Sequence, residues 1–315
     1  MSSTTLLGPQ RFLTTAGTVV RALGTEGPVV TVTAGWEERE DDDTELREVM
    51  DGRVVNLRLH QRMMSLLAED TPFATAAVAF RDAMADLSAV YATRLHHGLE
   101  GVYAVHRSTA RPDIVASALA EAVRLVREVD RWYLRAVDQL DGELEATGAL
   151  AGSAALRQHR AEVAEILSGA GVLAIAGGHV GVLGRALRLF AVTPPPDLPV
   201  VAWSGGAMAV TARVVLFHDH APTGFSDAEI WARGLGRAMG IVALPHARRR
   251  LRLDDRVRMS VLASRFADDT CVLLDDGSRV ALTADGALPA GTRVLAADGT
   301  VTALAGPLCR AGAAR

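Results

Sequence analysis

A serine stands between an apolar run and a run of small residues, and this setting favours a nucleophile. Residues 199–217 read PVVAWSGGAMAVTARVVLF, in which a buried strand leads to Ser204 and a helix is expected over residues 207–216. A serine held in a sharp turn between a strand and a helix is the arrangement of a nucleophile elbow. That turn brings together the positions two before and two after the serine, where the small residues Ala202 and Gly206 stand. The same pattern also fits a serine that only caps the helix.

Backbone amides near the serine could hold the oxyanion of a tetrahedral intermediate. Gly205 begins the expected helix, so its amide has no partner inside that helix. Gly177 and Gly178 end another expected parallel strand, over residues 171–176, and ligands bind at the carboxyl edge of such sheets. We expect Gly178 to supply the second amide of the oxyanion hole. The alternative is a glycine turn that serves backbone freedom alone.

Histidines and carboxylates in the C-terminal half supply candidates for a general base. An unassisted serine hydroxyl is not nucleophilic at neutral pH, and we expect His246, at the end of a predicted strand on the same sheet edge as the serine, to be its base. Asp276, with Asp275 as the alternative, would orient the imidazole. His218 and His220 have a spacing that suits a metal, but the sequence shows no third or fourth ligand, so a polar loop beside the site and no metal is the expectation.

A run of arginines follows the candidate base. Its members are Arg248, Arg249, Arg250 and Arg252. Guanidinium groups bind carboxylates through paired hydrogen bonds, so the run could hold an acidic group of the substrate, and Arg248 is the residue we favour. The alternative is a solvated helix face without a ligand.

The composition describes a globular chain and excludes several kinds of chemistry. Hydrophobic residues make up 49% of the 315 residues, which is enough for a sizeable core. The absence of lysine excludes a Schiff-base lysine, and a net charge of −4 gives no field that attracts nucleic acid or a membrane surface. Cys271 and Cys309 lie away from the serine and cannot form a disulfide framework. Without a signal peptide in residues 1–10 or an apolar run of ~18 residues, we expect a cytoplasmic protein that uses no cofactor.

The elements that must position these residues form an α/β pattern with a long helical interruption. Strands are expected at residues 28–36, 53–59, 171–176, 199–203 and 241–244. Helices are expected at residues 153–167, 182–190, 207–216, 227–239 and 256–266. Apolar residues three or four apart, as from Phe73 to Tyr91 and from Pro112 to Leu140, predict long helices in the interruption.

These elements predict a three-layer α/β fold around a parallel sheet. Beyond Cys271, the runs CVLLDDGSRVAL and TRVLAADGTVTAL each contain an Asp-Gly turn and predict hairpins. The expected parts are residues 1–59 as the first piece of the α/β domain, 60–152 as a helical insertion, 153–270 as the core with the elbow, and 271–315 as a β-hairpin-rich end.

Four segments resemble motifs of the dipeptidase E and cyanophycinase family of serine peptidases. Gly177-Gly178-His179 matches a GGN or GGD strand end, and Ala202-Trp203-Ser204-Gly205-Gly206-Ala207 matches the elbow G-x-S-A-G-A. Leu244-Pro245-His246-Ala247-Arg248-Arg249 matches the segment with the catalytic histidine. The segment Leu274-Asp275-Asp276-Gly277-Ser278 is similar to I-D-E-x-T-A, with aspartate where the family has glutamate.

The resemblance implies the flavodoxin-like fold of class I glutamine amidotransferases and a Ser204–His246–Asp276 triad. It covers residues 171–282 well and residues 28–55 loosely, whereas the helical insertion lies outside it. It implies hydrolysis of an amide or peptide bond in a small, aspartyl-containing peptide. We expect Gly177, His179, Trp203 and Arg248 to contact that substrate, although His179 replaces the family's amide or carboxylate.

A protein that has lost activity is the competing hypothesis. Its helical insertion, which carries Met63, Met64, Trp132 and Tyr133, would then serve assembly or partner binding. Because an insertion of about 100 residues offers apolar surface that a monomer covers poorly, we expect a homodimer.

Overall fold

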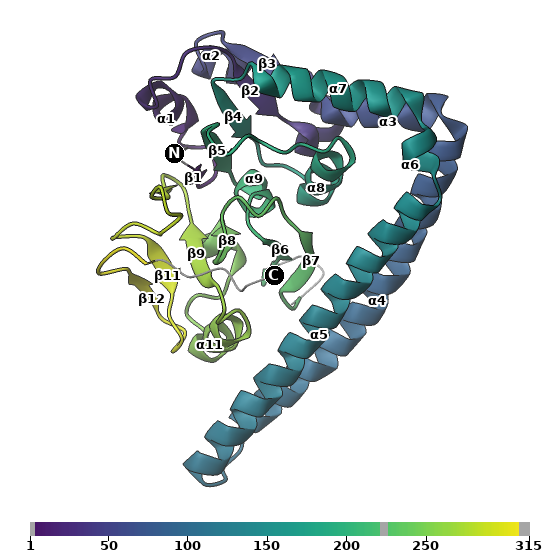
Figure 1. The fold of residues 1–315 in the computed structure, drawn as a ribbon. Helices are drawn as coiled ribbons and strands as arrows, with labels where there is room; N and C mark the ends of the chain where they lie inside the picture. The colour runs from purple at the N-terminus through teal and green to yellow at the C-terminus, as the bar shows by residue number, and fades with distance from the viewer. Residues whose placement is uncertain (1–3, 221–225, 309–315) are drawn as a thin grey trace.

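A six-stranded, mostly parallel sheet lies at the centre of the protein (Figure 1). It belongs to a computed structural model that describes residues 4–220 and 226–308. The strand order is β10-β1-β5-β4-β2-β3, and only β10, at one edge, pairs antiparallel. The strands are β1 (Thr4–Leu7), β2 (Val29–Val32), β3 (Val54–Asn56), β4 (Val172–Ile175), β5 (Val200–Trp203) and β10 (Arg279–Ala281).

Alternate residues of the central strands face two separate helical layers. In β5, Val200 and Ala202 join an apolar cluster with α3 and α8, whereas Val201 and Trp203 join a second cluster with α1 and α2. A strand buried on both faces therefore reads as a continuous apolar run. The helices are α1 (Ala16–Ala22), α2 (Thr44–Val49), α3 (Leu59–Glu69) and α8 (Val180–Leu189). The predicted flavodoxin-like three-layer α/β fold is confirmed.

A second sheet, of order β12-β11-β9-β8, carries the C-terminal part of the described chain. Its strands are β8 (Ile241–Pro245), β9 (Thr270–Leu274), β11 (Arg293–Leu295) and β12 (Val301–Ala303). β8 and β9 are parallel, and the chain passes between them through α10 (Ala247–Arg250) and α11 (Arg256–Arg265). The antiparallel pair β6 (Arg213–Leu216) and β7 (Glu229–Arg233) forms a small separate sheet.

Two of the predicted helices, at residues 207–216 and 227–239, are wrong. The elbow helix α9 (Gly205–Ala209) is short, because the Thr211 hydroxyl donates to the Met208 carbonyl at 2.8 Å and the chain turns into β6. The second segment contains β7, in which the even positions Ile230 and Ala232 are buried and their neighbours are more exposed. That alternation has the period of a strand.

Of the two hairpins predicted near the C-terminus, the first is wrong and the second is confirmed. The Asp276-Gly277 turn does not join a hairpin, because β9 belongs to the second sheet while β10 pairs with β1 of the first. The chain therefore crosses from one sheet to the other at this turn. The second hairpin, between β11 and β12, is confirmed. Strand β1 was not predicted, and the strand expected at residues 28–36 ends at Val32, where the short helix η1 (Ala34–Arg39) follows.

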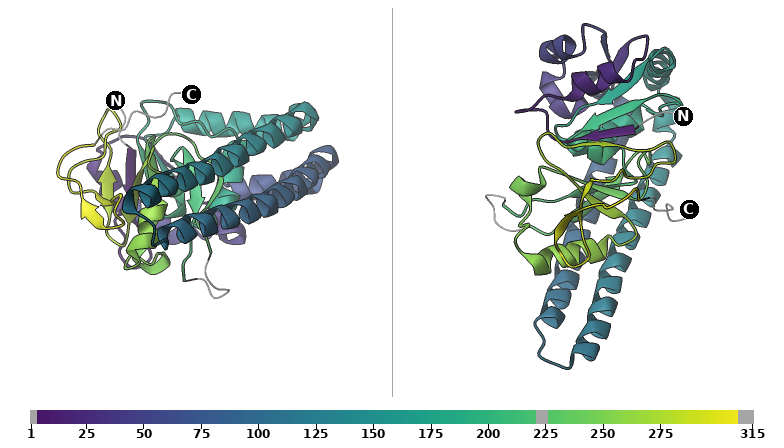
Figure 2. Two further views of the ribbon diagram at one scale, coloured as in Figure 1. Left: turned by 90° about the horizontal axis from the view of Figure 1, so that it is seen from below. Right: turned by 90° about the vertical axis from the view of Figure 1, so that its left-hand side faces the viewer.

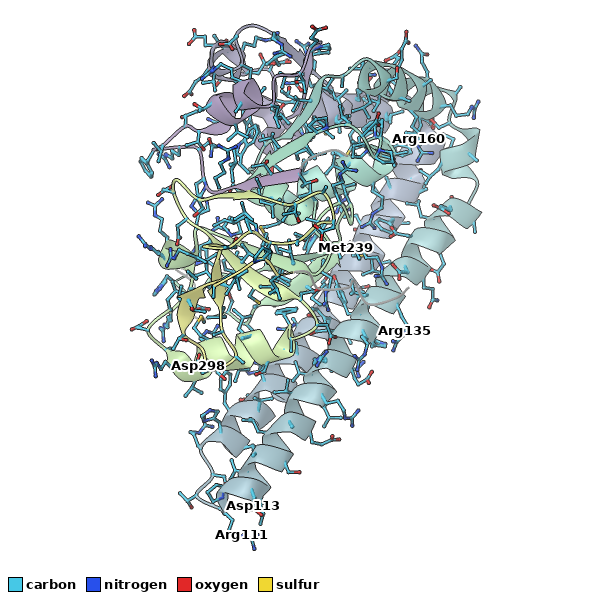
Figure 3. The ribbon with its side chains drawn as sticks, turned by 60° about the vertical axis from the view of Figure 1, so that its left-hand side comes forward. Arg111, Asp113, Arg135, Arg160, Met239 and Asp298 are labelled. Atoms are coloured by element: carbon cyan, nitrogen blue, oxygen red, sulfur yellow. The ribbon has the colours of Figure 1, made fainter. Side chains whose placement is uncertain are left out.

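The helical interruption contains two long helices, which form an antiparallel hairpin (Figure 1). Its helices α4 (Thr71–His106) and α5 (Pro112–Ala146) lie side by side in all views, and their tip, at Arg111 and Asp113, projects beyond the core (Figures 2 and 3). The short α6 (Ala149–Gly152) and α7 (Ala154–Ser168) return the chain to β4. Across residues 4–220 and 226–308, no helix combines the length and apolar character needed to cross a membrane.

A buried ion pair fastens this hairpin to the core. Arg265 of α11 donates from Nη2 to Asp130 of α5 at 2.6 Å, and both side chains are at most 4% exposed. The Tyr91 hydroxyl of α4 donates to the same carboxylate at 2.8 Å and accepts from the Ile230 amide of β7 at 3.1 Å. The hairpin is thereby held against β7, which forms one wall of the pocket described below.

Candidate active site

Ser204 lies at the turn between β5 and α9 in a strained backbone conformation. Its φ of 52° and ψ of −121° are rarely adopted by a residue with a side chain. The turn is tight: a Cβ at Gly206 would approach the Ile175 carbonyl oxygen to 2.2 Å, and one at Gly177 would approach Ser204 Oγ to 3.0 Å. Only glycine fits at Gly206 without a backbone shift, which explains the small residue that the sequence shows there.

His246 comes within hydrogen-bond distance of the serine. Its Nε2 lies 3.3 Å from Ser204 Oγ, slightly longer than a tight catalytic hydrogen bond, as is common without a substrate. The residue follows β8 in a left-handed conformation, with φ 56°, and its amide donates to the Leu274 carbonyl at 2.9 Å. His246 is thus brought in from the second sheet, whereas the sequence placed it on the same sheet edge as the serine.

The surroundings of His246 keep its imidazole neutral. Burial is the main cause that lowers its pKa from the ordinary value of 6.5, and the charges of Arg250 and Arg249 lower it further. Asp276 and Asp275 oppose this effect through their charges. At neutral pH the ring therefore holds a free nitrogen that can accept a proton from Ser204.

The carboxylate expected to orient His246 does not contact it. Asp275 is buried, but its oxygens accept hydrogen bonds from the Arg248 amide at 2.9 Å and from Arg293 Nη1 at 3.1 Å. Asp276 is exposed in the crossing between the sheets. In the described part of the chain neither carboxylate hydrogen-bonds to His246, so the structure shows a serine–histidine pair without the third member.

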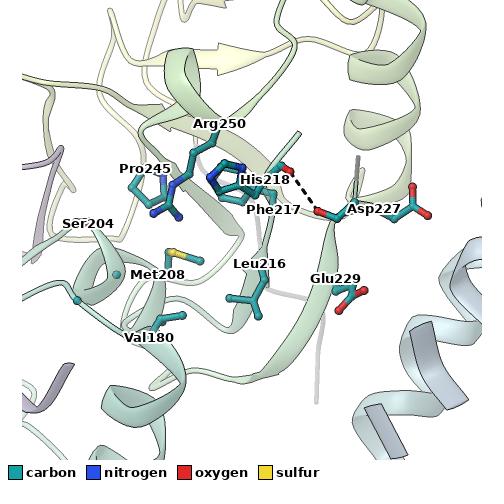
Figure 4. A pocket seen from close by; sticks show the side chains of 13 residues that line it. Val180, Ser204, Met208, Leu216, Phe217, His218, Asp227, Glu229, Pro245 and Arg250 are labelled. Carbon is teal, nitrogen blue, oxygen red and sulfur yellow. Dashed lines mark hydrogen bonds between the residues drawn. The ribbon is translucent and has the colours of Figure 1, made fainter. Parts of the chain in front are cut away.

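A pocket of about 280 Å³ opens beside the serine (Figure 4). Its walls come from α8, α9, α10, β6, β7 and β8 and from the segments between them. They include Gly178, Val180, Ser204, Gly205, Met208, Leu216, Phe217, His218, Ser226, Asp227, Glu229, Pro245 and Arg250. Gly178 and Gly205, from which we expect the oxyanion hole, both line it, and in residues 4–220 and 226–308 their amides donate to no backbone carbonyl. Both N–H groups remain available to a ligand.

The pocket holds opposite charges at two places. Arg250 reaches from α10 toward Met208, and burial lowers its pKa (Figure 4). Among the described residues its guanidinium has no carboxylate partner. On the β7 wall, burial and the neighbouring charge of Asp227 raise the pKa of Glu229. The pocket therefore offers a cationic group near the serine and carboxylates farther away.

Of the arginine run, the structure places Arg250, and not Arg248, in the wall of this pocket. Arg248 is exposed, with its Nε 3.6 Å from Asp275, and it does not line the pocket. Arg250 does, at the C-terminal end of α10, and its positive charge acts on His246.

Two other residues expected to contact substrate lie elsewhere. Trp203 is 6% exposed and packs in the cluster on the opposite face of the sheet. His179 caps α8 by accepting a hydrogen bond from the Val182 amide at 3.1 Å, and its side chain is 63% exposed. His218 lines the pocket and His220 is exposed. Within the described ranges, no three His, Cys, Asp or Glu side chains gather as a metal site would require.

Comparison with known proteins supports the fold. No family model and no curated protein matches the sequence. The structure is similar to the crystal structure of a peptidase from an acI-B1 Actinobacterium, with 12% sequence identity and a TM-score of 0.50. The match covers 97% of this chain and 95% of that chain. At this level of identity the likeness shows a shared fold over nearly the whole length of both chains.

Proposed function

We propose that the protein is a serine hydrolase that cleaves an amide or peptide bond in a small acidic peptide. The observation that carries this proposal is the approach of His246 Nε2 to Ser204 Oγ, 3.3 Å, at a serine with strained elbow geometry. The structural likeness to a peptidase agrees with it. The resemblance of the elbow, glycine and histidine segments to dipeptidase E and cyanophycinase motifs supports the same reaction class.

The reaction would proceed through an acyl-enzyme. Ser204 Oγ attacks the carbonyl carbon of the substrate while its proton passes to His246 Nε2. The amides of Gly178 and Gly205 hydrogen-bond to the resulting oxyanion. When the C–N bond breaks, the imidazolium returns the proton to the leaving amine. A water then repeats these steps on the ester and releases the acid and the free serine.

Arg250 supports an acidic substrate. A carboxylate bound to this guanidinium would satisfy a charge that the described part of the protein leaves without an anion. The pocket of about 280 Å³ suits a short peptide rather than a folded protein. The family resemblance suggests aspartyl peptides, and the position of Arg250 close to the serine agrees with a carboxylate near the scissile bond.

A hydrolysis screen tests this proposal. Dipeptides and tripeptides that contain Asp or Glu are compared with matched peptides that contain Asn or Gln, and release of the amine is measured. We expect wild-type protein to cleave the acidic peptides preferentially, and Ser204→Ala to cleave none. Arg250→Gln should lose the preference for acidic peptides while retaining hydrolysis. If folded wild-type protein cleaves no peptide, the alternative that the fold serves assembly or partner binding is favoured.

A further inference from the structure

A second cavity, of about 660 Å³, lies between the helical hairpin and the α/β core. It is lined by residues of β7 and of the helices α3 to α8, and its volume is in the range of small-molecule sites. Its walls are mainly apolar and include Met63, Phe73, Phe80, Met84 and Leu150. Met64 and Val78 also line it and are 46% and 43% exposed, so the cavity presents apolar surface to solvent.

This cavity is separate from the pocket beside Ser204. Both lie along the same face of β7, with Glu229 lining the first and Trp231 the second. The indole of Trp231 packs over α8, where a Cβ at Gly184 would approach it to 2.8 Å and one at Gly181 to 3.4 Å. Trp231 thus lies against the two glycines of α8, between the two spaces.

Positive charge predominates around the cavity. Its charged lining residues are Arg81, Arg160, Arg185, Arg188, Asp141 and Glu145. Asp141 is paired with Arg188, and Arg160 donates to the Leu189 carbonyl at 2.8 Å. Arg185 has no ion pair or hydrogen bond among the described residues, and burial together with the charge of Arg81 lowers its pKa. An anion bound to Arg185 would stabilise its charged form against both burial and the charge of Arg81.

We propose that this cavity binds a free fatty acid of medium length, with its carboxylate at Arg185 and its chain among the apolar residues. A long apolar wall requires a ligand with a long apolar part, and an unpaired guanidinium beside a second arginine requires an anionic head. Both requirements are met by a single-chain carboxylate. A volume of about 660 Å³ accommodates one such chain but is too small for a helix of a partner, which is about 10 Å wide.

Calorimetric titration of the purified protein with decanoate tests this proposal. We expect one molecule bound per chain, with octanoate roughly fifteenfold weaker because two buried methylenes are missing. Decan-1-ol lacks the negative charge, and its affinity should be at least about tenfold lower than that of decanoate. Arg185→Gln should weaken decanoate binding by about the same factor. Arg135→Gln is the matched control, since this exposed arginine of α5 (Figure 3) does not line the cavity and should leave affinity unchanged.

A second variant and a mass measurement complete the test. Ala77→Phe places a large side chain in the cavity and should abolish binding while the melting temperature stays close to that of wild type. The proposal is overturned if decanoate does not bind, or if Arg185→Gln or Ala77→Phe binds it as wild type does. It is also overturned if light scattering shows a dimer that Ala77→Phe dissociates and decanoate does not, since a second copy then occupies the cavity. None of these outcomes depends on hydrolytic activity.

Discussion

Replacing Gly177 by alanine would place a methyl group directly against the nucleophile. The added Cβ would lie 2.7 Å from the Ser204 Cβ and 3.1 Å from the Gly205 amide nitrogen. Carbon atoms pack at about 3.5–4.0 Å, so the serine would have to move by roughly 0.8 Å or more. Gly177 does not have a positive φ, so its backbone accepts alanine and the strain falls on the elbow.

A displacement of this size should slow the nucleophile by about a hundredfold. Misplacement of a reacting group by about 1 Å costs on the order of 10² in rate. The measurement is the second-order rate of covalent labelling by a fluorophosphonate, followed by mass spectrometry of the peptide that contains Ser204. Overpacking should lower the melting temperature by only a few degrees, because it costs about 1–3 kcal/mol.

The matched control is Gly142→Ala. Gly142 lies in α5, and an added Cβ would meet no atom within 4 Å, so labelling should be unchanged and the melting temperature equal or slightly higher. Labelling of folded Gly177→Ala at the wild-type rate would refute the reasoning. It would show that the close approach of Gly177 to the serine does not exist in solution.

Three further changes test other parts of the molecule. Asp276→Asn should slow labelling by less than about tenfold, because the described residues show no hydrogen bond between Asp276 and His246; a loss near 10⁴ would identify it as the orienting acid. The labelling rate should fall as pH drops through a midpoint below 6.5, because protonation of His246 removes the base. Arg250→Gln removes one cause of the lowered pKa of His246 and should move this midpoint to higher pH. An unchanged midpoint would contradict the assignment of His246 as the titrating base. Arg265→Met leaves the buried Asp130 carboxylate with the Tyr91 hydroxyl but without its cationic partner, and should cost about 3–5 kcal/mol in urea unfolding, whereas a cost below about 1 kcal/mol would show that this pair does not fasten the hairpin.

The elbow and the long helices could be predicted because their signals are local. A buried strand followed by a serine and small residues specifies a tight turn within a few positions, and the structure forms that turn at Ser204. A repeated apolar stripe indicates the long helices. Capping residues mark where helices begin, as at Asp70 and Ser153, whose side chains accept hydrogen bonds from the Phe73 and Leu156 amides.

The remaining features depend on contacts between distant segments. The turn after β9 has the sequence of a hairpin turn, but β10 pairs with β1 of the central sheet and not with β9. The chain therefore crosses between the two sheets, and Asp276 in this crossing is exposed to solvent. Asp275 instead satisfies Arg293, which is 18 residues away and belongs to β11. No sequence pattern near position 275 predicts the contact with Arg293. The strand β7 could not be predicted because its five residues are too few to distinguish the period of a strand, 2 residues, from that of a helix, 3.6 residues.

The central claim is that Ser204 is a nucleophile activated by His246, and covalent labelling tests it most directly. Wild-type protein is treated with a fluorophosphonate beside Ser204→Ala and His246→Ala, each checked for folding by circular dichroism, and the adducts are mapped by mass spectrometry. We expect one adduct on Ser204 in wild type, none in Ser204→Ala, and labelling slowed by about 10²–10⁴ in His246→Ala. Folded wild-type protein without an adduct, or an adduct that persists in Ser204→Ala, would contradict the claim.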